Sequence, residues 1–267
     1  MDVKVFCFSP VGNTEKIAMH LGKTLARHLG GALIERSFTL PQERQAPLVA
    51  TAGEIVILAL PVYAGRLPNV MAKYLQTMEA TGALCVPVVV YGNRNFDDAL
   101  TEGQLVCEHA GGQVIGGGAF VAQHSFSKTL AVNRPDELDM AQVEQFATAL
   151  AQKIQAGDTH IPLLAGNNPP HPYYTPRDRH GNGIDIRKVT PKVGDGCVQC
   201  GLCAQHCPMG SINPANVKEM QGICIKCCAC EKRCPVGVRY FDDPNYIYHR
   251  KELEEMYSRR AEPVWFV

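Results

Sequence analysis

The chain has 267 residues, of which 46% are hydrophobic, and its 26 basic side chains balance its 26 acidic ones. This length allows one large domain and a smaller one, and the composition is that of a folded globular protein rather than a disordered one. The charge balance gives no argument for a nucleic-acid partner. The sequence has no apolar run of 18 residues and no pattern of a secretory leader, so we expect a cytoplasmic protein with no membrane span.

Strands and helices are predicted to alternate in residues 1–157. Five apolar runs rich in β-branched residues read as strands: "VKVFCFS", "ALIERS", "EIVILAL", "LCVPVVVY" and "QVIGGGAFVA". Segments with a 3.6-residue apolar period read as helices, at 13–29, 68–80, 95–110 and 136–156. This alternation predicts a parallel α/β sheet, with "EIVILAL" and "VPVVVY", apolar on both faces, at its centre.

The loop "FSPVGNTEKIA" joins the first strand to the first helix, at the sheet edge where ligands bind. A helix N-terminus offers free backbone N–H groups to a phosphate. Ser9 and Thr14 can donate hydroxyls, Gly12 allows close backbone approach, and Asn13 can cap the helix. A plain strand-to-helix turn is the alternative. The loop resembles the flavodoxin phosphate loop, T/S-x-T-G-N-T, except that Val11 stands where that family usually has a hydroxyl.

The flavodoxin resemblance covers about residues 1–157 and implies a doubly wound five-stranded sheet in the order 2-1-3-4-5, with FMN at the switch between strands one and three. It brings the loops "PVYAGRLP" and "YGNRNFDD" to the flavin ring. Tyr63 is expected to cover a ring face, and Arg94 to stabilise the anionic reduced flavin. The full set of predicted ring contacts is Pro61, Val62, Tyr63, Gly65, Tyr91, Gly92, Asn93, Arg94 and Phe96.

Each of these ring contacts is equally compatible with an ordinary surface loop. His124, in the loop "AQHSFSKTLAVNRP" after the fifth strand, is a candidate proton donor to reduced flavin, with an ordinary loop histidine as the alternative. Three isolated cysteines, Cys7, Cys85 and Cys107, lie on strand or helix patterns and are expected in the core.

The rest of the chain divides by composition. Residues 158–192, rich in Pro, Gly, Asn and His, read as a linker whose Tyr173 and Tyr174 form a surface strap. Residues 193–240 hold the remaining nine cysteines. In residues 241–267 a helix is followed by a tail with the only tryptophan, which we expect to be docked on the protein; a dimer contact or a lid is the alternative.

Residues 193–240 repeat the spacing C-x₂-C-x₂-C-x₃-C-P after 27 positions. In sequences with this spacing, three cysteines bind one four-iron cluster and the fourth binds the other. One predicted ligand set is therefore Cys197, Cys200, Cys203 and Cys234, and the other is Cys224, Cys227, Cys230 and Cys207. Cys228 is out of register and is expected to be a small buried hydrophobe. Structural zinc is the alternative, and it would leave half of the eight ligands unused.

The cysteine repeat resembles the bacterial two-[4Fe-4S] ferredoxins over residues 193–240, which implies one-electron transfer at low potential. Lys226, Lys232 and Arg233 interleave with the second motif, whereas the first motif has no such cations. Because nearby cations favour the reduced cluster, we expect the cluster on the Cys224 set to have the higher potential.

Taken together, the two parts resemble the flavodoxin–ferredoxin fusion proteins known as EFR-type ferredoxins of anaerobes. The resemblance implies an electron carrier that relays electrons between FMN and two [4Fe-4S] clusters, with ferredoxin-type proteins or oxidoreductases as partners, acting as a monomer or homodimer. The alternative is an enzyme, a ferredoxin-linked flavin reductase of a small organic acceptor. No nicotinamide-binding G-x-G-x-x-G follows a strand, which disfavours direct NADH oxidation.

Overall fold

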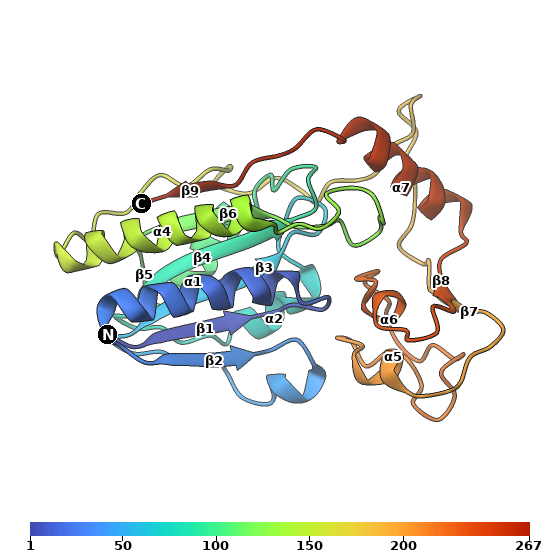
Figure 1. The fold of residues 1–267 in the computed structure, drawn as a ribbon, viewed down its shortest axis with the longest axis horizontal. Coiled ribbons are helices and arrows are strands. Elements are labelled where there is room, and N and C mark those ends of the chain that lie inside the picture. Colours follow the sequence, from blue (N-terminus) through green and yellow to red (C-terminus); the bar gives the residue numbers. More distant parts are fainter.

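A computed structural model describes all 267 residues of the chain, and its larger unit is a parallel sheet between two layers of helices (Figure 1). The central order is β2-β1-β3-β4-β6, and β5 pairs with the start of β4. Since β5 and β6 are two parts of the predicted fifth strand, this is the doubly wound order 2-1-3-4-5, and the predicted fold class is confirmed. The strands are β1 (Val3–Cys7), β2 (Leu33–Ser37), β3 (Ile55–Pro61), β4 (Leu84–Tyr91), β5 (Gln113–Val114) and β6 (Gly117–Val121).

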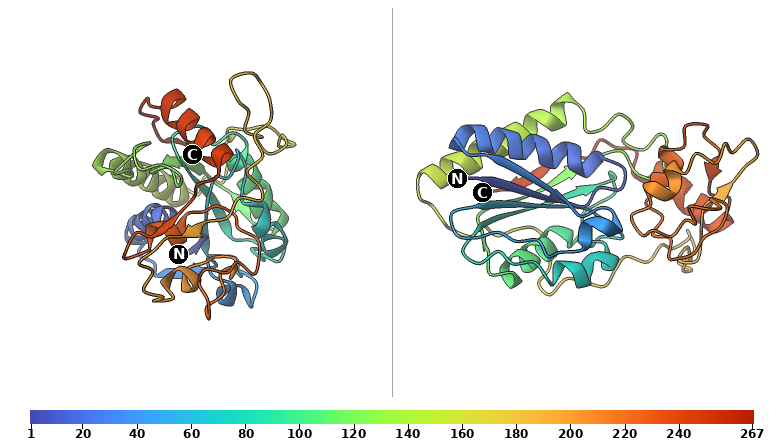
Figure 2. Two further views of the ribbon diagram at one scale, coloured as in Figure 1. Left: turned by 90° about the vertical axis from the view of Figure 1, so that its right-hand side faces the viewer. Right: turned by 90° about the horizontal axis from the view of Figure 1, so that it is seen from below.

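Two long helices, α1 (Asn13–Leu29) and α4 (Glu137–Gln155), cover one face of the sheet, and α2 (Ala72–Leu75) and α3 (Ala99–His109) cover the other (Figure 2). Two short 3₁₀ helices, η1 (Pro41–Arg44) and η2 (Asn69–Met71), complete these layers.

The helix predicted over 68–80 is wrong in length, because only η2 and the four residues of α2 are helical. The backbone N–H of Glu79 donates to Leu48 O, and that of Ala80 donates to Ala110 O. Hydrogen bonds to neighbouring segments thus replace those that would continue the helix.

The core lies on both faces of the sheet because strand side chains alternate in direction. Val3, Val5 and Cys7 pack beneath α1 and α4, whereas Phe6 and Phe8 belong to the core on the opposite face. Cys7, Cys85 and Cys107 are all at most 2% exposed, as predicted for core residues.

The cysteine-rich unit lies beyond the carboxyl ends of the strands (Figure 1). It contains an antiparallel pair, β7 (Lys192–Val193) and β8 (Arg239–Tyr240), and two one-turn helices, α5 (Leu202–Gln205) and α6 (Ala229–Lys232). The backbone shows the repeat directly. Gly201 and Cys228, which are equivalent in the two copies, cap α5 and α6 in the left-handed conformation, with φ of 77° and 62°.

After the cysteine-rich unit, α7 (Pro244–Met256) leads into a C-terminal segment that returns along the sheet to β9 (Val264–Phe266). Strand β9 pairs antiparallel with β6 and adds an edge strand that the sequence did not predict. Trp265 packs against Phe146, with ring centroids 5.7 Å apart, and donates to Gln142 Oε1 at 3.2 Å. The expected docking of the tail is therefore seen in the structure.

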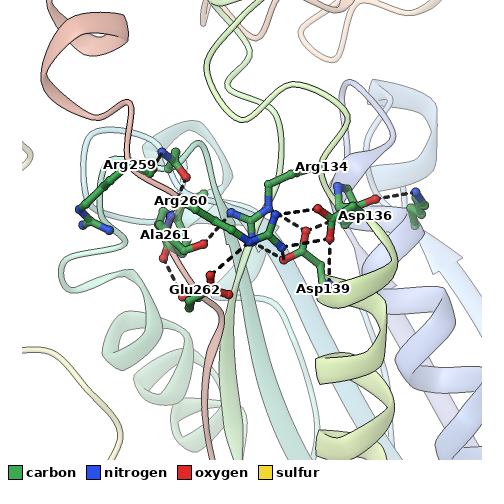
Figure 3. A network of polar contacts seen from close by, with 11 residues as sticks. Arg134, Asp136, Asp139, Arg259, Arg260, Ala261 and Glu262 are labelled. Atoms are coloured by element: carbon green, nitrogen blue, oxygen red, sulfur yellow. Dashed lines mark hydrogen bonds and ion pairs between the residues drawn. The ribbon is translucent and has the colours of Figure 1, made fainter.

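Charged side chains also hold the C-terminal segment in place (Figure 3). Arg134, buried against Asp139, donates from Nη1 to the carbonyl of Ala261 at 2.6 Å. Arg260 donates from Nη1 to Asp136 at 2.7 Å, and this hydrogen bond lowers the pKa of the Asp136 carboxyl. The cysteine-rich unit is thus connected to the sheet at both ends, through residues 158–192 and through this segment.

No helix of the structure combines the length and the apolar character needed to cross a membrane.

Candidate functional site

A cavity of about 810 Å³ lies where the carboxyl edge of the sheet meets the cysteine-rich unit. The sheet contributes the loops after β1, β3, β4 and β6. The opposite walls come from residues 173–187 of the linker, residues 223–226 of the cysteine-rich unit, and α7. The volume is within the range of pockets that bind cofactors.

The loop after β1 presents free backbone donors to this cavity. Val11, Asn13 and Thr14 line it, and the N–H groups of Asn13 and Thr14 donate no hydrogen bond within the chain. Gly12, with φ of 90°, is the N-cap of α1, and Ser9 Oγ accepts from the N–H of Glu15 at 3.0 Å. Such N–H groups at the start of a 17-residue helix fit a phosphate.

Three of the predicted phosphate-loop residues thus line the cavity, while Ser9 and Gly12 shape the turn behind it. Asn13 is the first residue of α1 and does not cap the helix as expected, because Gly12 holds that position. Its side-chain amide instead donates to the carbonyl of Gln123, at 3.5 Å.

The loop after β3 is a tight turn in which Tyr63 and Arg66 exchange two backbone hydrogen bonds, of 2.9 and 3.1 Å. Gly65 has φ of 80°, and a Cβ at this position would come within 2.3 Å of Asp97 Oδ2. Pro61, Val62, Tyr63 and Gly65, four of the predicted ring contacts, line the cavity.

Tyr63 also faces the second cysteine motif. Burial raises the pKa of its hydroxyl, and the nearby thiols of Cys227, Cys228 and Cys224 raise it further. Tyr63 is therefore near both the cavity and the second cysteine motif.

In the loop after β4, Tyr91, Gly92 and Arg94 line the cavity, but Asn93 and Phe96 do not. Asn93, 3% exposed, donates from Nδ2 to the carbonyls of Tyr257 and Arg259, both at 2.6 Å. Phe96 instead packs against Tyr91, with ring centroids 5.6 Å apart.

Arg94 is not a free cation. Its guanidinium is ion-paired with Asp97 and lies 4.5 Å from the centroid of the Tyr174 ring. Tyr174 donates from its backbone N–H to Ala64 O at 2.8 Å, which fixes the strap against the sheet. Asp97 therefore offsets much of the charge that was expected to stabilise reduced flavin.

His124 lines the cavity beside Gly92, where a Cβ would lie 2.4 Å from the imidazole Cδ2. Its Nδ1 accepts from the N–H of Phe126 at 3.2 Å, which places the proton of the neutral ring on Nε2. Burial, reinforced by His249, Lys232 and Arg94, lowers the pKa of His124 to about 3. The ring is therefore neutral at pH 7 and can donate a hydrogen bond, but it is not a charged acid there.

All twelve cysteines are free thiols. A second, nearly filled space of about 20 Å³ is lined by 14 residues, among them Cys228 and the four cysteines of one predicted ligand set, Cys207, Cys224, Cys227 and Cys230. Ile223, Cys224 and Ile225 line both this space and the large cavity. Residues of the second motif thus form a wall common to both.

Several donors point at the cysteine sulfurs, although burial raises the thiol pKa of Cys224, Cys227 and Cys230. Backbone N–H groups of Ser211 and Lys226 donate to Cys207 Sγ and Cys224 Sγ, at 3.3 and 3.4 Å. Arg239, 3% exposed, donates from Nη2 to Cys203 Sγ at 3.4 Å, while its Nε and Nη1 have no partner. Hydrogen bonds to sulfur are a feature of iron–sulfur sites, and an orphaned buried cation fits an anionic group beside it.

No group of three or more His, Cys, Asp or Glu side chains in the structure has the geometry to hold one metal ion. The ligand sets for the clusters therefore stay a prediction. Cys228, in contrast, is 1% exposed in a small apolar cluster with Phe241 and Tyr246, as expected for a core residue.

No protein-family profile matches the chain, and no curated protein matches it. Among solved structures, a flavodoxin of Streptococcus pneumoniae TIGR4 is 23% identical, covers 57% of this chain and 99% of its own, and has a TM-score of 0.40. An archaeal flavodoxin is 15% identical, with coverages of 58% and 99% and a TM-score of 0.41. The likeness concerns fold alone, and at these TM-scores the fold assignment rests on the strand order of the sheet itself.

Proposed function

We propose that this protein transfers electrons, with FMN held in the large cavity and two [4Fe-4S] clusters held by the eight cysteines of the repeat. The observation that carries the proposal is the position of Cys224. This predicted cluster ligand lines the cavity that the sheet loops form, and it also lines the small space that Cys207, Cys227 and Cys230 help to line. Flavin supplies both one- and two-electron chemistry when bound, whereas clusters of this kind exchange single electrons.

The chain offers a binding group for each part of FMN. The free N–H groups of Asn13 and Thr14, at the positive end of the α1 dipole, would hold the phosphate. Tyr63 provides an aromatic surface for the ring, next to the second motif. The loop at His124 and the strap at Tyr174 line the cavity and would limit access of water to the ring from their sides.

The cluster ligands are proposed as two crossed sets. Cys224, Cys227, Cys230 and Cys207 would hold the cluster beside the cavity. Cys197, Cys200, Cys203 and Cys234 would hold the other, and Cys200 in this set is exposed to solvent. A protein partner that exchanges single electrons can therefore approach the second set from outside.

The proposal is tested by cofactor content. Protein purified without oxygen should contain one FMN and about eight irons per chain. Thr14→Trp, which fills the predicted phosphate site, should lose flavin but keep iron, and Cys224→Ala should lose iron but keep flavin. Colourless protein, or protein that holds zinc in place of iron, would refute the proposal.

A second function, reduction of a small organic acceptor, is favoured by the two loops that line the cavity. Residues 122–126 and the strap residues 173–176 both line it, so that a small molecule could be held against a bound ring. If this function holds, reoxidation of the reduced protein by an enone such as cyclohexenone should saturate with acceptor concentration. A rate that rises linearly with acceptor favours the carrier alone.

A further inference from the structure

Arg239 is a buried cation for which the structure provides no counter-ion. It begins β8, where it pairs with Val193 of β7, and only 3% of the residue is exposed. Its Nη2 donates to the carbonyl of Val217 and, at 3.4 Å, to Cys203 Sγ. Nε and Nη1 are buried without partners, and Arg239 takes part in none of the ion pairs of the structure.

This arrangement is unfavourable unless an anion lies beside the guanidinium. Arginine side chains carry their positive charge inside proteins as well as in water. Burial of an unpaired charge carries a large desolvation penalty. Cys203 Sγ is the only atom able to carry negative charge to which Arg239 donates a hydrogen bond.

We propose that Arg239 is the internal counter-ion of the cluster bound by the Cys203 set, and that it raises the reduction potential of that cluster above that of the cluster on the Cys224 set. The inference rests on the proposed function. Reduction adds one negative charge to a cluster, and a buried cation stabilises that charge strongly because little water screens it. The charge of Arg239 also reaches Cys224 and Cys230 of the other set, but Arg239 donates a hydrogen bond to Cys203 alone. We therefore expect it to favour the reduced form of the Cys203-set cluster more strongly.

The cations inside the second motif are less well placed for this effect. Lys232 and Arg233 are exposed, so solvent and salt screen them. Lys226 directs its Nζ to the carbonyl oxygens of Arg187 and Cys224, at 3.0 and 2.9 Å. We thus infer the higher potential for the Cys203-set cluster, whereas the charges along the sequence led us to expect it for the Cys224-set cluster. Sequence distance did not reveal that the best-buried cation lies outside both motifs.

The difference in reduction potential between the two clusters determines on which of them an electron is more stable. The Cys224 set lies at the cavity, whereas the Cys203 set includes the exposed Cys200. A higher potential at the Cys203 set makes an electron more stable on the side that an external partner can reach.

The test is an EPR-monitored redox titration of the full-length, cluster-loaded protein in which Arg239→Gln, Arg239→Lys and Arg233→Gln are compared with the wild type. Cys200→Ser changes a proposed ligand of the Cys203 set, so the EPR signal that it alters is assigned to the cluster on that set. In Arg239→Gln the ratio of reduced to oxidised Cys203-set cluster at a fixed potential should fall about tenfold, a shift of ~59 mV for one electron. Arg239→Lys keeps the charge, and Arg233→Gln is a matched control at an exposed arginine. Neither variant should change the potential of the Cys203-set cluster.

Two results would overturn the inference. One is an Arg239→Gln protein with both clusters bound and both potentials unchanged. The other result concerns Arg239→Lys and is decisive if Arg239→Gln does not bind iron. Arg239→Lys should then bind both clusters and keep the wild-type potential of the Cys203-set cluster. Failure to bind them, or a tenfold shift in the ratio of reduced to oxidised cluster, would contradict a role for the charge. Wild-type protein without clusters is a separate outcome, because it refutes the proposed function itself.

Discussion

At position 228 the second copy of the cysteine repeat differs from the first at a position that shapes the backbone. The first copy has Gly201 where the second has Cys228, and both residues adopt the left-handed conformation before a one-turn helix. This conformation is unfavourable for a residue with a Cβ. Cys228 Sγ lies 3.4 Å from the Tyr246 hydroxyl in an apolar cluster, so packing offsets the backbone strain.

We therefore predict that Cys228 is not a ligand. Cys228→Ala should keep about eight irons per chain and lower the free energy of unfolding by about 1 kcal/mol through lost packing. Cys227→Ala, the adjacent control, should lose iron. Iron analysis together with thermal unfolding checks both, and loss of iron from Cys228→Ala would show that it binds metal.

His124 should make the protein sensitive to acid. Its folded-state pKa of about 3 lies well below the ordinary value of 6.5, so between these pH values the unfolded chain binds more protons than the folded one. Stability contributed by neutral His124 is complete above about pH 6.5 and falls as the pH is lowered.

His124→Asn keeps an acceptor for the Phe126 N–H but cannot titrate. The drop in thermal midpoint between pH 7.5 and pH 5.5 should therefore be smaller for this variant than for the wild type. His20→Asn, at a part-exposed histidine on α1, serves as the control and should show the wild-type drop. Equal drops for His124→Asn and wild type would argue against a buried neutral imidazole.

At the scale of elements, the C-terminal segment depends on Asn93. The side chain satisfies three backbone groups of residues 257–261, donating to two carbonyls and accepting from the Ala261 N–H at 3.1 Å. A buried polar group left without its partner costs about 1–3 kcal/mol.

Asn93→Ala should accordingly lower the free energy of unfolding by about 2–4 kcal/mol and expose residues 257–261 to protease. Asn95→Ala, at an exposed asparagine in the same loop, should change stability by less than about 0.5 kcal/mol. Unfolding curves and limited proteolysis measure both. Wild-type protease resistance of Asn93→Ala would show that β9 alone holds the segment.

The sequence predicted the elements that carry a long periodic pattern and missed those fixed by contacts. β3 and β4 are central because both their faces are apolar, and α1 and α4 follow their predicted bounds within a residue. β9 was missed because three residues are too few for a pattern, and α2 is short because loop contacts end it. Of the ring contacts, Asn93 was misplaced because its partners lie more than 160 residues away, a separation that local pattern cannot reveal.

For the molecule as a whole, the important feature is that the cysteine-rich unit has two connections to the sheet. Residues 158–192 enter it and the segment leading to β9 returns from it, so that one wall of the cavity is fixed against the other (Figure 1). A free linker only raises the local concentration of a partner, whereas two connections also restrict its orientation. If FMN and the clusters bind as proposed, electrons should therefore pass between them within one chain.

The most direct measurement of this claim is the rate at which one electron, injected by a laser flash from an external photosensitiser, redistributes between flavin and clusters in the full-length protein. We predict a rate constant that does not depend on protein concentration, because Cys224 forms part of the wall of the cavity proposed to hold FMN. A rate that increases in proportion to protein concentration would mean that electrons pass between molecules, and would contradict the account.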